Sequence, residues 1–252
     1  MYSCHQLAAG VMAAKPSSML YEGLKSIQEW LLPGTCMLCS ARVAAPQAFC
    51  ADCESALPRL TDACPQCAVP MAHSDASGQH CGACQKRPPA FFRTHALYRY
   101  ARPIDGFVQA LKYRRRLELA RVFGERLAEA LAPRVTGSVD LIVPVPLHPA
   151  RLRERGYNQS LELARPIAAR LSLPLDYRCL WRSRPTAPQA SLALSQRRRN
   201  VRGAFAAAPT VAKLRVAVVD DVMTTGHTVN EAARCLRAAG AKSVQVWVLA
   251  RA

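Results

Sequence analysis

The stretch VAVVDDVMTTGHTVNEA, Val216–Ala232, decides the fold class of this 252-residue chain. It opens on apolar, mostly β-branched residues, which predict a buried strand over 215–219. Two acids, Asp220 and Asp221, follow directly. A run of threonines with one glycine then leads into a helical pattern over 228–239. We therefore expect a strand, a polar turn and a helix in succession.

The polar turn predicts a site for a sugar phosphate. In open α/β sheets, ligands bind beyond the carboxyl ends of the strands, where Asp220 and Asp221 stand. The helix N-terminus that follows presents unpaired N–H groups and a positive dipole end, which favour an anion. Gly226 lets the backbone curl around that anion, and carboxylates bind hydroxyls or a hard cation such as Mg²⁺. The hydroxyl donors of the turn are Thr224, Thr225 and Thr228. The alternative is that a threonine only caps the helix and the acids are ordinary strand-end residues.

Further strands and helices alternate along the chain before and after this stretch. Apolar runs predict strands over 95–100, 140–145, 178–182 and 244–249. Helical periodicity predicts helices over 21–35, 103–113, 118–131 and 157–171. Residues 183–202 are polar, rich in arginine and without a clear period, so they predict a long loop. The alternation is typical of a parallel α/β sheet.

Eight of the eleven cysteines form Cys-x-x-Cys pairs, namely Cys36/Cys39, Cys50/Cys53, Cys64/Cys67 and Cys81/Cys84. Such a turn places both thiolates on one side of the chain, and two turns complete a tetrahedral Cys₄ zinc site, so we expect about two structural zinc ions. Disulfides, the alternative, need an oxidising compartment. We expect no export signal, because the apolar stretch over 7–14 is short and interrupted by glycine.

The spacing of the cysteines leaves their pairing open. Sequential pairing puts the first four on one zinc ion and the last four on a second, and an interleaved arrangement is compatible with the same spacing. His73 or His80 could replace one thiolate. Because residues 36–84 contain little apolar material, we expect metal to supply their folding free energy. The single cysteines Cys4, Cys179 and Cys235 are expected not to bind metal.

The charge of the chain is strongly positive, with 34 Lys and Arg against 17 Asp and Glu and a net charge of +17. It gathers at 112–116, 151–155 and 197–202. Such clustering favours contact with phosphate, on a small metabolite or on nucleic acid, whereas the alternative is a solvated basic surface. No apolar run reaches the roughly 18 residues that a membrane-spanning helix needs. We expect no membrane insertion and a cytoplasmic protein.

These motifs also resemble a known family. Residues 220–228 are similar to the motif with which type I phosphoribosyltransferases bind 5-phosphoribosyl 1-pyrophosphate (PRPP). The blocks 155–160, 186–189 and 198–201 are similar to those of the ComF (GntX-type) family, which is linked in bacteria to competence and DNA utilisation. That family carries a zinc ribbon before its transferase-like domain. The resemblance implies a type I phosphoribosyltransferase-like parallel sheet with helices on both faces, preceded by a small Cys-rich zinc-ribbon domain.

The resemblance also implies residue roles. Asp220 and Asp221 would hold the ribose 2- and 3-hydroxyls and support the cationic sugar during catalysis. The residues that would cradle the 5-phosphate are Thr224, Thr225, Gly226, His227 and Thr228. Loop 143–148 stands where the superfamily places its pyrophosphate loop, and Arg151 and Arg155 that follow would contact pyrophosphate, with Mg²⁺ accompanying PRPP. The loop over 183–202 would close over the site.

Three functions stay open at this point. The first is a Mg²⁺-dependent phosphoribosyltransferase with an unknown acceptor. The second is a protein that grips single-stranded DNA and uses a non-catalytic domain as a PRPP sensor. The third is a scaffold whose zinc ribbons dock DNA-processing proteins. We expect 1–20 to be a disordered or non-native start, 21–88 a helix plus double zinc ribbon, and 89–252 the phosphoribosyltransferase-like domain.

Overall fold

The computed structural model describes residues 34–71, 79–183 and 201–252. By its contacts the chain divides into two compact units, Met1–Ala56 and Leu57–Ala252. The last four cysteines of the Cys-x-x-Cys pairs thus share a unit with the predicted transferase-like domain. The domain boundary predicted near residue 88 refers to independent folding, which the division by contacts does not test. It stays a prediction.

Some sequence predictions concern residues outside the described ranges. They include the segment 1–20, the helix expected over 21–35 as far as residue 33, His73, and the loop residues 184–200. The last two residues of the expected helix, Gly34 and Thr35, lie instead in a strand. Proline and glycine at 33–34 end the helical pattern, and backbone pairing with a second strand takes over.

The described part of the first unit consists of two short strands and one helix. Strand β1 (Gly34–Thr35) pairs antiparallel with β2 (Arg42–Val43), and α2 spans Ala51–Ser55. Val43 and Phe49 are its larger buried apolar side chains. So little apolar burial does not offset the conformational entropy of folding, which supports the expectation that metal stabilises this unit.

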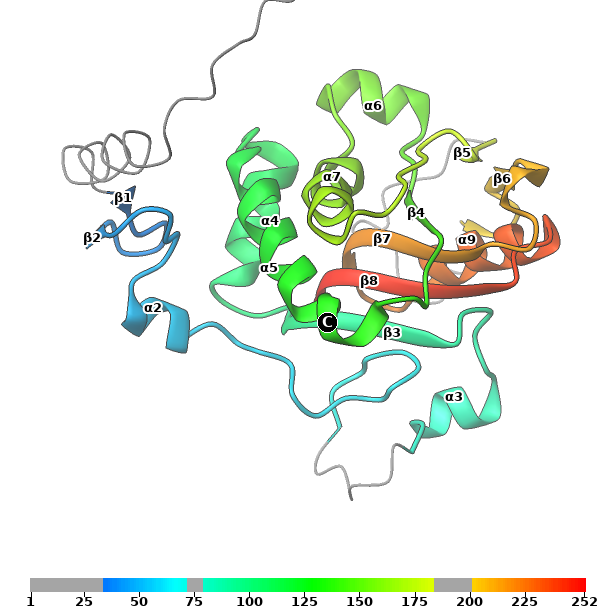
Figure 1. Cartoon of the computed structure of the whole chain (residues 1–252), viewed down its shortest axis with the longest axis horizontal. Coiled ribbons are helices and arrows are strands. Elements are labelled where there is room, and N and C mark those ends of the chain that lie inside the picture. The colour runs from blue at the N-terminus through cyan, green and yellow to red at the C-terminus, as the bar shows by residue number, and fades with distance from the viewer. Residues whose placement is uncertain (1–33, 72–78, 184–200) are drawn as a thin grey trace, which may run out of the picture. The chain divides into compact units, whose positions relative to one another are not determined.

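Four parallel strands form the central sheet of the second unit, in the order β3-β8-β7-β4 (Figure 1). Their bounds are β3 Arg93–Arg99, β4 Leu141–Pro144, β7 Arg215–Met223 and β8 Ser243–Arg251. Val218 on β7 pairs with Val246 on β8 and Val143 on β4, and all three are fully buried. The predicted parallel α/β sheet is confirmed, and its β-branched strands read as continuous apolar runs because both faces are covered.

Helices cover both faces of this sheet (Figure 1). On one face lie α5 (Glu118–Val135) and α7 (Gln159–Leu171), with α4 (Ile104–Tyr113) beside α5. On the other face lies α9 (His227–Ala238). Its buried residues recur at helical spacing and pack on the sheet: Val229, Ala232, Ala233 and Leu236. This periodicity, visible in the sequence, determines which face of α9 packs on the sheet.

Helices α5 and α7 approach each other closely at a glycine. A Cβ atom on Gly124 would stand 2.3 Å from Cγ of Pro166 and 2.8 Å from the carbonyl oxygen of Leu163. Both partners are part of α7, so neither can move away cheaply. The absence of a side chain at Gly124 thus lets α5 and α7 pack closely together. Helix α7 also packs against strand β7.

The remaining elements are short and lie around the sheet. They are α3 (Gly82–Lys86), α6 (Pro149–Arg155), β5 (Leu180–Arg182), β6 (Phe205–Ala207) and the 3₁₀ helix η2 (Pro209–Val211). Strands β5 and β6 pair antiparallel and so bring the two ends of segment 183–204 together. The helix predicted over 157–171 begins at Gln159, after Asn158 caps it by accepting a hydrogen bond from Ser160 N.

Candidate functional site

Strand β7 continues past the end of its neighbour β4, and this difference opens the site. β4 pairs with β7 only as far as Pro144, opposite Val219. β7 continues to Met223, still paired with β8. Asp220 and Asp221 therefore lie inside the strand, whereas the sequence predicted that the strand ends before them. Pairing with β8 holds them extended while the side that faced β4 is free for a ligand.

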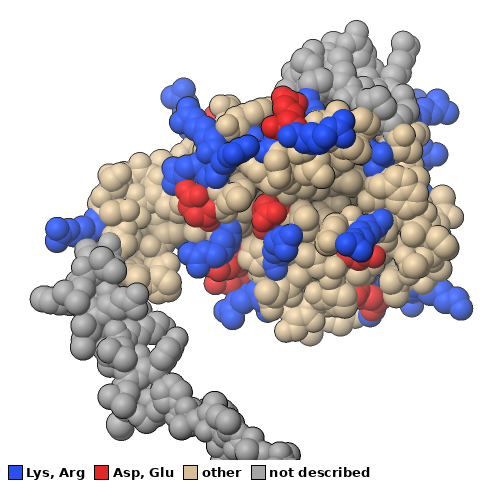
Figure 2. Space-filling view, turned by 90° about the horizontal axis from the view of Figure 1, so that it is seen from above, with Lys and Arg blue, Asp and Glu red and all other residues tan. Residues whose placement is uncertain are grey.

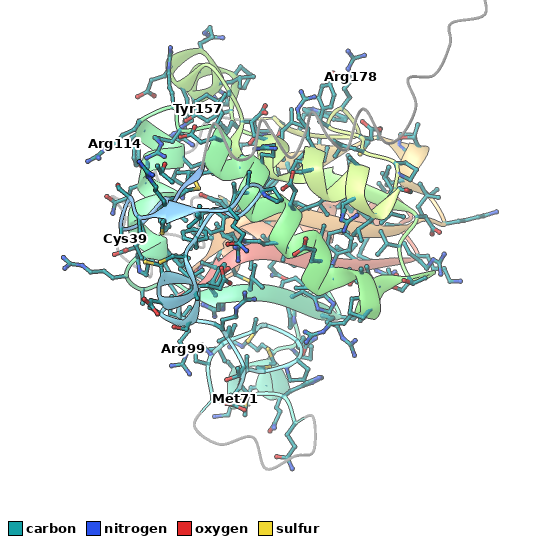
Figure 3. All side chains as sticks on the ribbon, turned by 60° about the vertical axis from the view of Figure 1, so that its left-hand side comes forward. Cys39, Met71, Arg99, Arg114, Tyr157 and Arg178 are labelled. Carbon is teal, nitrogen blue, oxygen red and sulfur yellow. The ribbon has the colours of Figure 1, made fainter. Side chains whose placement is uncertain are left out.

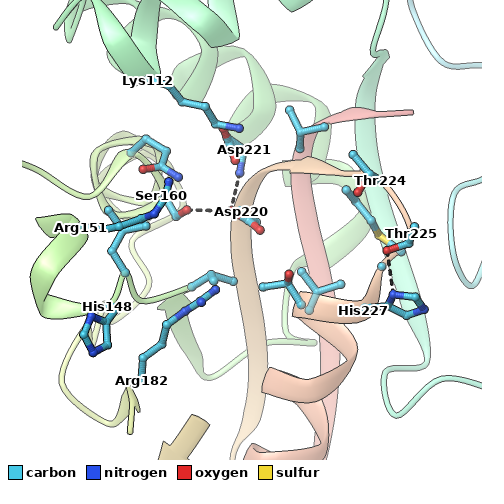
Figure 4. Close-up of a pocket in the computed structure, with 18 of the residues that line it drawn as sticks. Lys112, His148, Arg151, Ser160, Arg182, Asp220, Asp221, Thr224, Thr225 and His227 are labelled. Atoms are coloured by element: carbon cyan, nitrogen blue, oxygen red, sulfur yellow. Dashed lines mark hydrogen bonds and ion pairs between the residues drawn. The ribbon is translucent and has the colours of Figure 1, made fainter. Parts of the chain in front are cut away.

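Asp220 is held by helix α7. The hydroxyl of Ser160 donates a hydrogen bond to Asp220 Oδ1 at 2.8 Å, and the N–H of Asp221 donates to the same oxygen at 2.9 Å (Figure 4). Asp220 is 8% exposed. Burial raises the pKa of Asp220 to about 7, the charge of Asp221 acts in the same direction, and the Ser160 hydroxyl opposes the rise.

Asp221 is paired with a lysine from α4. Nζ of Lys112 lies 2.6 Å from Asp221 Oδ2, and the carboxylate is 3% exposed (Figure 4). Burial by itself lowers the pKa of Lys112, but the carboxylate of Asp221 outweighs burial and the pKa is raised. The ion pair compensates for the loss of water around both side chains.

The turn after β7 has the backbone that the sequence predicted. Gly226 adopts the left-handed conformation with φ of 74° and caps α9. A Cβ atom there would stand 2.7 Å from Cε of Met223. Thr225 Oγ1 and His227 Nδ1 lie 3.0 Å apart. The first N–H groups of a helix have no partner within the helix, so α9 offers donors at its N-terminus.

A cavity of about 390 Å³ joins these parts (Figure 4). The residues predicted to bind a sugar phosphate and pyrophosphate all line it: Arg151, Arg155, Asp220, Asp221, Thr224, Thr225, Gly226, His227 and Thr228. Arg151 and Arg155 stand four residues apart on α6, which puts both on one side of that helix. The ligand of the cavity stays a prediction.

Arginines form the wall opposite the threonine turn. In Figure 4, Arg151, His148 and Arg182 lie across the cavity from Thr225 and His227. Nε of Arg182 donates to the carbonyl of Pro146 at 3.0 Å, so this side chain holds the loop after β4. One wall thus presents guanidinium groups and the other hydroxyls and a helix N-terminus, both of which suit phosphate oxygens.

The structure adds cavity residues that the sequence did not single out as a site. They are Tyr100, Gln159, Ser160 and Arg182, whereas His148 belongs to the loop over 143–148 that the resemblance assigned to pyrophosphate. Ser160 belongs to a block that resembles the ComF family, so a signal for it existed. Arg182 is one arginine among many in its segment, and only the pairing of β5 with β6 places it at the cavity. Lys112, the first residue of the basic cluster at 112–116, also lines the cavity.

The cysteines gather into two clusters of four, which we call the first cluster (Cys36, Cys39, Cys50 and Cys53) and the second cluster (Cys64, Cys67, Cys81 and Cys84). The sulfur atoms of Cys39 and Cys50 lie 3.7 Å apart, and those of Cys67 and Cys81 lie 3.6 Å apart (Figure 3 labels Cys39). A tetrahedron with Zn–S bonds of about 2.3 Å has edges of about 3.8 Å. Both clusters therefore fit zinc, and no disulfide joins the described cysteines.

The clusters resolve the pairing that the sequence left open. The first four cysteines form one cluster and the last four form the other, so the sequential pairing is confirmed and the interleaved arrangement is wrong. His80 belongs to neither cluster, so eight thiolates suffice. Cys179 and Cys235 also stand outside both clusters, as predicted, and Cys4 lies outside the described residues.

Charged side chains on one face of the molecule are more often basic than acidic. On the face shown in Figure 2, Lys and Arg side chains are spread widely, with fewer Asp and Glu side chains between them. Within the described ranges, none of the helices combines the length and apolar character that crossing a membrane requires.

Two family models match the chain. The model described as a double zinc ribbon domain matches residues 27–85, and the model described as a phosphoribosyl transferase domain matches residues 157–252. The first range contains both cysteine clusters, and the second contains the acids and threonines of the cavity.

Two relatives whose names refer to DNA utilization or competence match most of the chain. A protein named DNA utilization protein YhgH from Salmonella typhimurium is 38% identical over 225 residues, which are 87% of this chain and 98% of the relative. Competence protein F from Haemophilus influenzae is 34% identical over 181 residues, 69% of this chain and 79% of the relative.

Solved structures with similar folds include phosphoribosyltransferases. Glutamine PRPP amidotransferase from B. subtilis shares 24% identity with a TM-score of 0.36, over 51% of this chain and 26% of that enzyme. A purine phosphoribosyltransferase from Pyrococcus horikoshii shares 15% identity with a TM-score of 0.32, over 50% of this chain and 80% of that protein. The chain spans about a quarter of the amidotransferase.

Proposed function

We propose that this chain, which belongs to the ComF family, binds PRPP in the cavity at the end of β7 and acts as a phosphoribosyltransferase on an acceptor still to be identified. The observation that carries the proposal is the shared cavity. Paired buried acids, a threonine turn at a helix N-terminus and an arginine wall face one space of about 390 Å³. PRPP carries ribose hydroxyls between a 5-phosphate and a diphosphate, and these three walls match its three parts.

In this proposal the ligand takes one orientation. The 5-phosphate lies at the turn formed by Thr224–Thr228, because main-chain donors and hydroxyls converge there. The ribose hydroxyls donate to Asp220 and Asp221. The diphosphate extends toward Arg151 and Arg182, whose charges would stabilise pyrophosphate as it leaves.

Mg²⁺, when it accompanies PRPP, neutralises part of the diphosphate charge. The oxygen ligands that this chain offers it in the cavity are the carboxylates of Asp220 and Asp221. Lys112 pairs with Asp221 and fixes the position of that carboxylate. Ser160 fixes the direction of Asp220. Both acids are therefore positioned before the ligand arrives, which lowers the entropic cost of binding.

Calorimetry with PRPP and Mg²⁺ tests the site. Replacing Asp220→Asn and Asp221→Asn together should weaken PRPP binding at least 100-fold, because two charge-assisted hydrogen bonds of roughly 1.5–3 kcal/mol each are lost. Asp105→Asn serves as a matched control, since this acid bonds the neighbouring N–H of Gly106 and does not line the cavity. Unchanged affinity in the double variant with an unchanged circular dichroism spectrum would refute the site.

Pyrophosphate release separates an enzyme from a sensor. The full chain is mixed with PRPP, Mg²⁺ and a panel of nucleobases and amines, and released pyrophosphate is measured. Release that depends on one acceptor supports the transferase. Tight PRPP binding with no release above the Asp220→Asn, Asp221→Asn background would leave PRPP sensing as the function of this site.

A role in DNA processing is the second candidate, and its support is the net charge of +17 together with relatives named for DNA utilization and competence. In this proposal the partner is single-stranded DNA or a DNA-processing protein, and the protein is cytoplasmic, where thiolates remain available to zinc. Affinity for a single-stranded oligonucleotide should fall steeply as salt rises if several phosphates are contacted. An affinity that does not respond to salt would exclude phosphate contacts by the basic surface.

A further inference from the structure

We propose that the second cluster positions the phosphate-binding turn, and that Arg251 is the residue through which it acts. This inference rests on the proposed function for the identity of the ligand, but its structural part does not. The second cluster and the turn belong to one compact unit. A cavity of about 720 Å³ has Cys67, Cys81 and Cys84 on its wall together with Gly226 and His227.

Arg251 joins the two parts directly. It is the last residue of β8 and is 7% exposed. Its Nε donates to the carbonyl of Cys67, a ligand of the second cluster, at 2.9 Å. Its Nη1 donates to the carbonyls of Met223 at 3.1 Å and Thr224 at 2.5 Å, where β7 passes into the turn, and also to the carbonyl of Ala252.

These contacts are mutually dependent. A buried guanidinium is stable only when acceptors surround it, and the acceptors of Arg251 are four backbone oxygen atoms. Backbone carbonyls hold Arg251 in place only if the backbone that carries them is itself fixed. Zinc would fix the Cys67 end further, because it would join this turn to the turn that carries Cys81 and Cys84.

The contacts also set the direction of the turn's donors. In a trans peptide the C=O and the following N–H point in opposite directions. The carbonyls of Met223 and Thr224 point to Arg251, so the N–H groups of Thr224 and Thr225 point away from it. Both threonines line the cavity proposed for PRPP. Arg251 is therefore a positioning residue that presents main-chain donors to a phosphate without touching it.

A second tie runs from the linker after the second cluster to helix α9. The side chain of Asn230 accepts a hydrogen bond from the N–H of Ala90 at 2.7 Å, and the N–H of Asn230 donates to Gly226 O at 2.9 Å. Asn230 thus connects the linker with the glycine that caps α9. Together with Arg251 it attaches both ends of the turn to the segment that carries the second cluster.

The test uses the full zinc-loaded chain with Arg251→Lys. Lysine keeps the positive charge but lacks the planar fork that reaches Cys67 and Thr224 at once. Backbone hydrogen exchange over residues 223–228 should quicken at least tenfold. Affinity for ribose 5-phosphate should fall at least tenfold, while affinity for pyrophosphate, whose proposed contacts lie on the arginine wall, should change less than twofold.

The matched comparison is between the clusters. Cys64→Ser with Cys67→Ser should lose one zinc ion and reproduce the faster exchange of 223–228. Cys36→Ser with Cys39→Ser should also lose one zinc ion and leave that exchange unchanged. If the second-cluster variant fails to fold, the Arg251→Lys variant tests the proposal by itself, provided that its zinc content and circular dichroism spectrum match those of the wild-type chain.

Defined outcomes overturn the inference. Exchange over 223–228 that is unchanged in Arg251→Lys refutes it, as does an equal acceleration in the variant of the first cluster. A fall in affinity for pyrophosphate as large as that for ribose 5-phosphate also refutes it, because it indicates a general loss of structure. If the wild-type chain binds no ribose 5-phosphate, the proposed function fails, and the exchange measurement still decides the role of Arg251.

Discussion

The first and second clusters are built from matching local parts. In each, the first Cys-x-x-Cys pair closes a turn in which a backbone N–H bonds back to the leading cysteine, from Ser40 to Cys36 at 2.9 Å and from Ala68 to Cys64 at 2.7 Å. Ser40 and Ala68 share a positive φ, 61° and 54°. In each cluster the second pair opens a short helix, α2 or α3. The local sequence thus produces the same Cys-x-x-Cys turn in both clusters.

The surroundings of the two clusters differ. The backbone of the first bonds to its own segment, as from Met37 N to Ala48 O at 2.9 Å. The second bonds to the parallel sheet: Gln66 donates to Phe91 O at 3.3 Å, and Thr94 on β3 donates to Gln66 O at 2.7 Å. The difference shows that one metal motif can form a separate unit or serve as a wall of a neighbouring domain.

Removal of the second cluster should give the largest effect. Cys81→Ser with Cys84→Ser is expected to lower the free energy of unfolding of unit Leu57–Ala252 by more than 4 kcal/mol, because structural zinc contributes roughly 10–16 kcal/mol to its ligand segment. Cys50→Ser with Cys53→Ser should leave the unfolding of that unit unchanged. Calorimetric melting with zinc analysis measures both. Equal melting temperatures in the two variants would contradict the expected difference between the two clusters.

Acid should distinguish the two units through His95 on β3. Burial lowers the pKa of His95 to about 4, and the charges of Arg93 and Arg134 act in the same direction. An unfolded histidine titrates near 6.5, so between these values the unfolded chain binds the extra proton, and stability is lost as pH falls. By itself His95 should cost about 2 kcal/mol of stability between pH 7 and pH 5, whereas Asp220, whose pKa is raised in the fold, favours the folded state over the same range.

The described part of the first unit, residues 34–56, contains no histidine. Urea unfolding at pH 7 and pH 5, with zinc content measured at both, checks the prediction for the second unit. Relative to its stability at pH 7, the His95→Gln variant should therefore be more stable at pH 5 than the wild-type chain by about the same 2 kcal/mol. Equal changes with pH in the two chains would refute the role of His95.

A single hydrogen bond should give a smaller effect. Thr94→Val keeps the shape of a buried side chain but removes the donor to Gln66 O, and we expect a loss of about 1 kcal/mol in the stability of the second unit. Zinc affinity of the second cluster should fall about fivefold, since 1.4 kcal/mol corresponds to a factor of ten. Thr136→Val, which removes an exposed bond to Ala132 O within α5, is the control.

Zinc release should show the smallest difference. Cys39 of the first cluster is exposed, whereas two thiols of the second cluster, Cys64 and Cys84, are buried. A chromogenic chelator should therefore take zinc from the first cluster several times faster, a barrier difference of about 1 kcal/mol. The Cys36→Ser, Cys39→Ser variant should lack the fast phase. Release in one phase from the wild-type chain would contradict the difference in exposure.

Much of the site was predictable because its residues are neighbours in sequence. The acids, threonines and glycine of 220–228 stand together since a strand must end, turn and enter a helix within a few residues. Helix α9 follows its apolar spacing closely, beginning at His227, one residue before the predicted start. The end of β7 was predicted too early, because polar side chains at Asp220 and Asp221 hide the backbone pairing with β8 that continues beneath them.

By itself the sequence determined the parallel α/β class, the zinc-binding turns and the strand–turn–helix unit at 220–228, because each follows from local spacing and periodicity. Only the tertiary structure decided which cysteines share a cluster, which lysine pairs with Asp221, that Ser160 holds Asp220, and that Arg251 joins Cys67 to the turn. The contacts of Ser160 with Asp220, of Lys112 with Asp221 and of Arg251 with Cys67 link residues from 60 to 184 positions apart. Local pattern carries no information on such pairs, since strand order and helix packing bring them together.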